Sequence, residues 1–389
     1  MPEFIEGGTI TSPQGFLAGA TSAGIKGEGL DLGILYSEVP AVSVGFFTKN
    51  RVKAAPLLIT MKRLPRGRAV VVNSGCANAG TGRRGIEDAI LVGKLAAAIL
   101  GIKEEEVLLA STGVIGEPLP ILKIRDHIGE IRLTKEGGHD FARAIMTTDR
   151  APKEGAVSIK AGGREVVVGG VAKGAGMIHP ELATMLCFIT TDAFISKGDM
   201  RKALKKAIDL SFNSLTVDGE TSPNDMVILI SNGLSGIEPP PELFEEALIM
   251  LCEKFARDIA RGAEGATKLI EVEVSGARND EEARLLGRRI ASSPLFKSAV
   301  HGGDPNWGRI LSAIGSAGFE DKGLSIKIGD AIVFRDGEPL DFDREKLRSL
   351  FSGEEVKVSI ELKLGRGRAR VFGCDLSEEY VKINSRYTT

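Results

Sequence analysis

Aromatic side chains are scarce in this chain of 389 residues, amounting to 5% with one Trp and three Tyr. Lys and Arg are spread along the chain and nearly balanced by Asp and Glu, so the formal net charge is only -2. A nucleic-acid surface needs clustered basic residues, and none is expected here. No apolar run approaches the roughly 18 residues that span a bilayer, and the start lacks the basic and apolar regions of a signal peptide. We therefore expect a cytoplasmic globular protein with one large core or two coupled lobes, not a membrane protein.

Cysteine and histidine are equally rare, with four of each. The cysteines lie far apart without a CxxC pair, which predicts reduced, buried thiols at Cys76, Cys187, Cys252 and Cys374. Cys187 is assigned to the core of a strand and not to chemistry. The histidines have no ligand-like spacing, so no metal site is expected. His179, next to Pro180, is predicted to be a loop residue and not a general base.

Glycine is the compositional excess, with 48 residues, many at expected strand-to-helix turns. Apolar runs predict strands at 69–73, 107–111, 165–171, 186–191, 226–231, 269–275, 324–328 and 356–362. Apolar residues at three- and four-residue intervals predict helices at 85–100, 197–210, 241–261, 281–293 and 344–351. The short Gly-rich turn between 355–363 and 369–373 favours antiparallel pairing of these two strands. The pattern predicts an α+β protein with mixed sheets covered by helices.

The clearest chemical signal is the segment 174–187, a Gly-rich run that leads into an apolar strand and carries the hydroxyl of Thr184. A Thr hydroxyl is a weak nucleophile without an adjacent base, and cutting the Ala183–Thr184 bond would free the residue's own α-amino group as that base. Such an amine has an unperturbed pKa of roughly 7.7 to 8, so it can accept and return the hydroxyl proton. Taken alone, Ala-Thr-Met-Leu is also typical of the start of a buried strand.

Several further blocks have a distinctive composition. They are Asn73 to Ala79, Ser111 to Gly116, Met146 to Asp149, Lys173 to Met177, Ala183 to Cys187, Thr190 to Asp192, Val217 to Asp225, Gly303 to Arg309, and the terminal Ile383-Asn384 and Tyr387 to Thr389. In order and spacing, and across essentially the whole chain, these blocks resemble the ornithine acetyltransferase family of arginine biosynthesis. The resemblance implies the family's four-layer αββα sandwich, with layering like that of N-terminal nucleophile hydrolases.

The resemblance also implies processing. The precursor would cleave itself between Ala183 and Thr184 into an alpha chain, 1–183, and a beta chain, 184–389, that begins with the nucleophile. The two chains would form one intertwined fold, since a cut inside a core leaves its packing intact. By the same resemblance, two copies of each would assemble into an α2β2 heterotetramer.

The site residues follow from the matching blocks. Ser111 to Gly116 follows a strand and reads either as an ordinary strand-to-turn junction or, by resemblance, as the oxyanion site formed by Thr112 and Gly113. The resemblance gives the substrate-binding residues as Thr147, Lys173, Thr184, Glu264, Asn384 and Thr389. Lys173 suits the carboxylate of an N-acetylated amino acid, and Glu264 suits the side-chain ammonium of ornithine.

The implied reaction is a ping-pong transfer in which Thr184 takes acetyl from N-acetylornithine, releases ornithine and passes acetyl to glutamate. It needs no cofactor. Whether acetyl-CoA also serves as a donor is left open. Two departures from the family pattern, Arg150 and Arg386, bear on which acyl donor or acceptor is preferred.

Two other functions fit parts of the sequence. An aminopeptidase or amidohydrolase would use the same liberated Thr184 and pass the acyl group to water. A non-catalytic metabolite-binding protein would remain uncut. Dependence on glutamate separates the first from a transferase, and the size of the chain under denaturing conditions separates the second.

Overall fold

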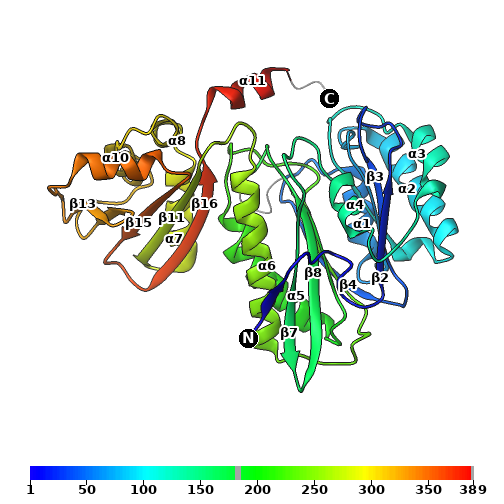
Figure 1. Ribbon diagram of the computed structural model, residues 1–389. Coiled ribbons are helices and arrows are strands. Elements are labelled where there is room, and N and C mark those ends of the chain that lie inside the picture. Colours follow the sequence, from blue (N-terminus) through cyan, green and yellow to red (C-terminus); the bar gives the residue numbers. More distant parts are fainter. Residues whose placement is uncertain (180–184, 387–389) are drawn as a thin grey trace.

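Two β-sheets lie face to face in the larger part of the molecule (Figure 1). The computed structural model describes residues 1–179 and 185–386. The first sheet has the order β1 (Glu3–Ile5), β7 (Lys153–Ala161), β8 (Arg164–Lys173), β9 (Leu186–Thr191), β10 (Met226–Ser231) and β4 (Val42–Phe47). The second has the order β2 (Phe16–Thr21), β3 (Leu32–Ser37), β5 (Ala69–Asn73) and β6 (Val107–Ser111).

Helices cover the outer face of each sheet. On the first sheet lie α5 (Lys197–Leu210) and α6 (Pro241–Arg261); on the second lie α1 (Ala55–Arg63), α2 (Gly82–Leu100) and α3 (Ile121–His127). A short helix, α4 (Gly138–Ala144), packs against β2. These layers form the predicted αββα sandwich, and α6 begins at Pro241 as expected.

The central strands are continuous apolar runs because both of their faces are buried. In β9, Cys187 and Ile189 pack in the core under the helices, whereas Leu186 and Phe188 pack in the core between the sheets. Successive side chains of a strand point to opposite faces, so one uninterrupted run serves both cores. Strands β5, β6 and β10 divide their residues in the same way.

A second lobe, which the sequence pattern did not separate, holds residues from β11 to β16. Its sheet has the order β14 (Glu338–Pro339), β13 (Ala331–Arg335), β12 (Ser325–Ile328), β15 (Glu355–Glu361), β11 (Leu269–Ala277) and β16 (Gly367–Cys374). Its helices are α7 (Asp280–Ala291), α8 (Pro294–His301), α9 (Gly308–Ser316) and α10 (Arg344–Ser352). A separate hydrophobic core holds this lobe together. The αββα sandwich is therefore only part of the fold.

The predicted pairing of 355–363 with 369–373 is wrong. Strand β11 lies between β15 and β16, parallel to the first and antiparallel to the second. Alternate residues of β11, including Ile270, Val272 and Val274, are buried in the lobe core. Strand β11 therefore has hydrogen-bonded neighbours on both of its edges. The short turn after β15 passes the end of β11, where the Leu364 N–H donates to the Gly276 carbonyl at 2.8 Å.

The last described helix, α11 (Glu378–Arg386), leaves the second lobe after β16 and extends over the sandwich (Figure 1). None of its residues is buried. Its position brings Asn384 to the loop that follows α6.

Candidate functional site

A cavity of about 610 Å3, open to solvent, lies where the loops after β6, β8 and α6 meet α11. Its lining residues are Thr112, Gly113, Ile115, Thr147, Thr148, Lys173, Ala175, Gly176, Met177, Ser222, Asn224, Glu264 and Asn384. Six residues predicted for the site are among them: Thr112, Gly113, Thr147, Lys173, Glu264 and Asn384. The predicted cleavage residue Ala183, the nucleophile Thr184 and the terminal Thr389 lie outside the described residues.

Thr112 and Gly113 follow β6 directly, and neighbouring backbone sets their conformation. The N–H of Thr112 donates to the Asn73 carbonyl at 3.0 Å, and the N–H of Val114 donates to the Gly75 carbonyl at 3.2 Å. Gly113 has φ +129°, and a Cβ there would overlap the backbone of Gly75, so the position requires glycine. Over residues 1–179 and 185–386, the Gly113 N–H and the Thr112 hydroxyl make no hydrogen bond. Two donors without a partner among the described residues thus lie beside the cavity, which suits an oxyanion site.

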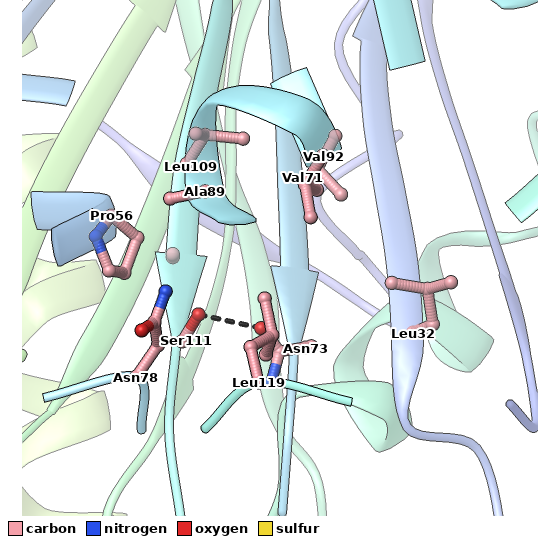
Figure 2. A pocket seen from close by; sticks show the side chains of 11 residues that line it. Leu32, Pro56, Val71, Asn73, Asn78, Ala89, Val92, Leu109, Ser111 and Leu119 are labelled. Carbon is pink, nitrogen blue, oxygen red and sulfur yellow. Dashed lines mark hydrogen bonds between the residues drawn. The ribbon is translucent and has the colours of Figure 1, made fainter. Parts of the chain in front are cut away.

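A polar network behind this turn supports it. Figure 2 shows the Ser111 hydroxyl donating to the Asn73 side-chain oxygen, at 2.6 Å. The Asn224 amide donates to the carbonyls of Ala77, at 2.7 Å, and Ser111, at 2.8 Å. Asn224 therefore connects the loop 217–225 to the end of β6 and positions Thr112.

The pocket drawn in Figure 2 is a different and much narrower one, between the second sheet and α2. Leu32, Val71, Val92, Leu109 and Leu119 are among its lining residues, and none of its lining side chains is titratable. Its Ser111 hydroxyl is engaged with the Asn73 side chain, and no basic side chain lines the cavity to activate it, so we place the site in the larger, polar cavity.

Lys173 is the last residue of β8, and its side chain is buried. Its Nζ donates to the Thr147 hydroxyl over a long 3.5 Å. Burial lowers the pKa of Lys173, and the nearby carboxylates of Asp149 and Asp225 oppose this effect. Within the described residues its one hydrogen bond is this weak contact with a neutral hydroxyl, so the Lys173 ammonium is suited to binding a substrate carboxylate.

Asp149 connects the segments around Lys173. Its carboxylate accepts from Lys153 Nζ at 2.5 Å and from the N–H groups of Gly174, at 2.8 Å, and Thr147, at 3.2 Å. Burial alone would raise the pKa of Asp149, but Lys153 and Lys173 lower it below its usual range. The resulting buried pair fixes the start of β7 against the end of β8.

Glu264 lies just beyond α6, with its carboxylate in the cavity. One oxygen accepts from the Thr148 hydroxyl at 2.7 Å, and the other accepts from the Asn384 amide at 2.9 Å. The Glu264 N–H donates to the Ala175 carbonyl at 2.9 Å. The Glu264 carboxylate lies so close to Gly176 that a Cβ there would force this side chain to move. Both partners are neutral, and the negative charge remains available for a cationic ligand.

The loop that carries Glu264 is held from both lobes. Arg150, one of the two departures from the family pattern, donates to the Ala266 carbonyl at 2.9 Å. It therefore contacts the loop that carries Glu264. In the second lobe, the buried Asp375 accepts from the Thr267 N–H at 2.8 Å and pairs with His301 Nδ1 at 2.7 Å. The second lobe thus helps to position Glu264.

The predicted burial of the cysteines and the predicted loop position of His179 are confirmed. All four cysteines are buried free thiols, and burial raises the pKa of Cys187 well above its usual range. His179 lies in a loop. In the described part of the chain, no group of three or more His, Cys, Asp and Glu side chains could hold a metal ion.

Sequence reasoning missed several residues of the cavity wall. Thr148, Gly176, Ser222 and Asn224 line it but were not assigned a role. All four stand inside the blocks that carried the resemblance, so a closer reading of those blocks could have proposed them. The partners of Thr148, Gly176 and Asn224 that shape the cavity are distant in sequence, whereas Ser222 accepts from the nearby Asn224 N–H.

The fold and this cavity define an α+β acyltransferase. The ArgJ family model matches residues 17–389, and the chain therefore belongs to the ArgJ family. It is 50% identical over 400 aligned residues to the arginine biosynthesis bifunctional protein ArgJ of Dehalococcoides mccartyi, covering 100% of this chain and 99% of that protein. The corresponding protein of Bacillus subtilis is 43% identical, covering 98% of this chain and 97% of the relative.

Solved structures give similar identities over part of the chain. The ArgJ crystal structure from Bacillus halodurans has 43% identity and a TM-score of 0.45, covering 46% of this chain and 97% of that one. The ornithine acetyltransferase of Mycobacterium tuberculosis, solved with ornithine, has 38% identity and a TM-score of 0.43, covering 46% of this chain and 98% of that one.

None of the helices within residues 1–179 and 185–386 combines the length and apolar character needed to cross a bilayer.

Proposed function

We propose that this chain transfers an acetyl group from N-acetylornithine to glutamate through an acetyl ester on Thr184. Membership of the ArgJ family makes the chain an acyltransferase of arginine biosynthesis. The observation that carries the proposal is the gathering of Thr112, Gly113, Lys173 and Glu264 around one cavity. Together they supply two oxyanion donors, a cation and an anion, which match an acetylated amino acid with a side-chain ammonium.

In the first half-reaction, the Thr184 hydroxyl attacks the acetyl carbonyl carbon, and its proton passes to the free α-amino group of the same residue. The Thr112 hydroxyl and the Gly113 N–H donate to the oxyanion that forms. The carbon–nitrogen bond then breaks, the leaving amine takes up the proton, and ornithine departs. In the second half-reaction, the amino group of glutamate attacks the acetyl ester, releasing N-acetylglutamate and the Thr184 hydroxyl.

The free α-amino group requires cleavage between Ala183 and Thr184, giving chains 1–183 and 184–389. Strand β8 precedes this bond and β9 follows it, and the two pair with Lys173 opposite Leu186. The hydrogen bonds between them do not depend on the connecting peptide, which supports two chains sharing one intertwined fold. We further propose assembly into an α2β2 heterotetramer.

Intact-mass analysis tests the cleavage. We expect chains 1–183 and 184–389 from the wild type and one uncut chain of about 41.3 kDa from Thr184→Ala. A cleaved Thr184→Ala variant would show that another agent cuts the bond. An uncut but active wild type would overturn the role of the α-amino group.

Incubation with N-acetylornithine without an acceptor should leave acetyl on Thr184, found by peptide mapping. Ornithine release should then stop after one turnover until glutamate is added. Continuous release without glutamate would instead indicate the hydrolase, with water as acceptor.

Acetyl-CoA is proposed as a second donor, because the relatives above are bifunctional proteins. Formation of N-acetylglutamate from acetyl-CoA and glutamate, with the processed enzyme, checks this. Arg150, which contacts the loop of Glu264, and Arg386, at the end of α11, are the residues to replace when donor and acceptor preference are compared. A biosynthetic role of this kind fits the cytoplasm.

Asn384 and Thr389 are proposed as substrate contacts from the terminal segment. Asn384 lines the cavity. Deleting residues 386–389 should raise KM for N-acetylornithine while self-cleavage proceeds. Unchanged kinetics in the cleaved, truncated protein would remove Thr389 from the site.

A further inference from the structure

The loop 217–225, recognised in the sequence only as a family block, holds the chain on both sides of the proposed cleavage segment. At its first end, the partly buried Asp218 accepts from the N–H groups of Met177, at 2.6 Å, and Ile178, at 2.9 Å. The backbone reinforces this contact, since the Val217 N–H donates to the Ile178 carbonyl at 2.8 Å. One carboxylate thus uses both oxygens to fix two consecutive residues.

Met177 needs such support. Its φ is +57°, in the left-handed region that non-glycine residues occupy at a cost. Glu264 lies against Gly176, one residue earlier, and also limits the path of this loop. The turn at Met177 is therefore held by specific contacts. The hydrogen bonds to Asp218 are the strongest of them, because the accepting carboxylate is charged.

At the other end of the loop, Asp225 holds the first described residue after the segment. Its carboxylate accepts from the Met185 N–H at 3.0 Å, and the Met226 N–H donates to the Met185 carbonyl at 3.1 Å. Asp225 is only 1% exposed. Its second carboxylate oxygen has no hydrogen-bond partner in the described part of the chain, which is unusual for a buried polar atom.

Packing of strand β9 alone does not require a buried carboxyl group here. Leu186 already pairs with Met226 in the parallel ladder, and Lys173 pairs with it on the other edge. Burying a carboxyl group costs free energy where only packing matters, even with Met185, Ser222 and the nearby charge of Lys173 to offset part of that cost. Its position next to Met185 is instead suited to fixing where β9 starts.

We propose that Asp218 and Asp225 are positioning residues for self-cleavage, holding the chain before and after the Ala183–Thr184 bond. This inference rests on the proposed function. The step they assist is the attack of the Thr184 hydroxyl on the Ala183 carbonyl carbon. The peptide C–N bond breaks, an ester forms, and the hydroxyl proton ends on the nitrogen that becomes the free α-amino group. Water then hydrolyses the ester, giving the Ala183 carboxylate and the Thr184 hydroxyl.

The geometry explains why the two carboxyl groups come from one short loop. An intramolecular attack is fast only when both reacting groups are held in register, and anchoring both flanks to one rigid loop supplies this constraint. The loop is itself fixed, because Asn224 donates to the carbonyls of Ala77 and Ser111. The same loop therefore supports the oxyanion turn and the cleavage segment.

The matched control is Asp192, at the opposite end of β9. It is also 1% exposed and accepts from two backbone N–H groups, those of Val167 at 2.9 Å and Gln14 at 3.1 Å. It does not line the cavity. Asp192→Ala removes a comparable buried anchor without touching the cleavage segment.

The experiment follows cleavage of the full-length precursor by intact mass over time, in wild type, Asp218→Ala, Asp225→Ala, Asp225→Asn and Asp192→Ala, with the thermal midpoint of each. We expect Asp218→Ala and Asp225→Ala to slow cleavage at least about tenfold. Asp225→Asn, which keeps an acceptor for Met185, should cleave faster than Asp225→Ala. Asp192→Ala should cleave at the wild-type rate, even if its thermal midpoint falls as much as those of Asp218→Ala and Asp225→Ala.

Wild-type cleavage rates in Asp218→Ala and Asp225→Ala would overturn the inference. Equally slow cleavage in Asp192→Ala would also overturn the inference, because the loss of cleavage rate would then result from a general loss of stability. Both outcomes leave the proposed function intact, because the wild type still cleaves. A wild type that never cleaves would instead refute the proposed nucleophile.

Discussion

Replacing Glu264 by Gln tests whether the cavity recognises the side-chain ammonium of ornithine through charge. In the structure the carboxylate accepts one hydrogen bond from Thr148, at 2.7 Å, and one from Asn384, at 2.9 Å. Gln keeps the shape of the side chain and one acceptor oxygen, so the loop after α6 should keep its conformation. The substitution removes the negative charge beside the cavity.

The size of the effect follows from the strength of one hydrogen bond between the substrate ammonium and this carboxylate. A hydrogen bond to a charged group contributes about 1.5 to 3 kcal/mol, which corresponds to about a tenfold to over a hundredfold loss in kcat/KM. Glu264 is partly exposed, and solvent screening places the expected loss towards the lower end of this range.

The assay compares two donors. N-acetylornithine carries the side-chain ammonium, whereas N-acetylnorvaline has the same carbon chain without it. With processed enzyme and saturating glutamate, Glu264→Gln should lower kcat/KM for N-acetylornithine and leave that for N-acetylnorvaline nearly unchanged. The control variant is Glu242→Gln, which removes an exposed charge in the first turn of α6 and should affect neither.

The ratio of the two kcat/KM losses isolates the contribution of the charge. An equal loss with both donors would refute the reasoning, because the variant would then have disturbed the cavity in general. No loss with either donor would show that the ammonium is bound elsewhere.

Three further changes have defined outcomes. Thr112→Val removes one oxyanion donor and should lower kcat of the cleaved fraction by a factor of about 10² to 10³. An unchanged kcat would show that the Thr112 hydroxyl does not stabilise the oxyanion. Phe188→Ala empties a fully buried site between the two sheets and should lower the free energy of unfolding by about 3 to 5 kcal/mol, measured with denaturant. Asp149→Asn leaves Lys153 buried without its partner and should cost about 3 to 5 kcal/mol at neutral pH. Because the fold lowers the pKa of Asp149, its contribution is present above the ordinary carboxyl pKa of about 3.9 and is lost as pH falls through the folded value, so the difference between wild type and variant should shrink in acid.

The sequence alone was sufficient for what depends on local pattern. The runs Ala69–Asn73, Val107–Ser111, Leu186–Thr191 and Met226–Ser231 form strands with the predicted ends. Their lack of polar alternation already implies burial on both faces, because such a run can be covered only between two layers. The strand end at Thr112-Gly113 was also predictable from local pattern, whereas its assignment as an oxyanion site came from the family resemblance.

Tertiary structure alone decided which segments became neighbours. The order of strands in the second lobe, with β11 between β15 and β16, could not be read from the short turn joining the latter two. Strand pairing is chosen by burial of whole faces, and each apolar strand offers similar edges to many partners.

The site shows the same division. Lys173 and Glu264, which are 91 positions apart in the numbering, were proposed from the family resemblance, but only the fold brings the loops after β8 and α6 together with α11 around one cavity. Thr148 and Asn384 as partners of Glu264, and Asp218 and Asp225 beside the cleavage segment, have no local signature. The sequence does not show whether a carboxylate is hydrated or accepts a hydrogen bond from a backbone N–H. Only the packing of distant segments determines which of the two occurs.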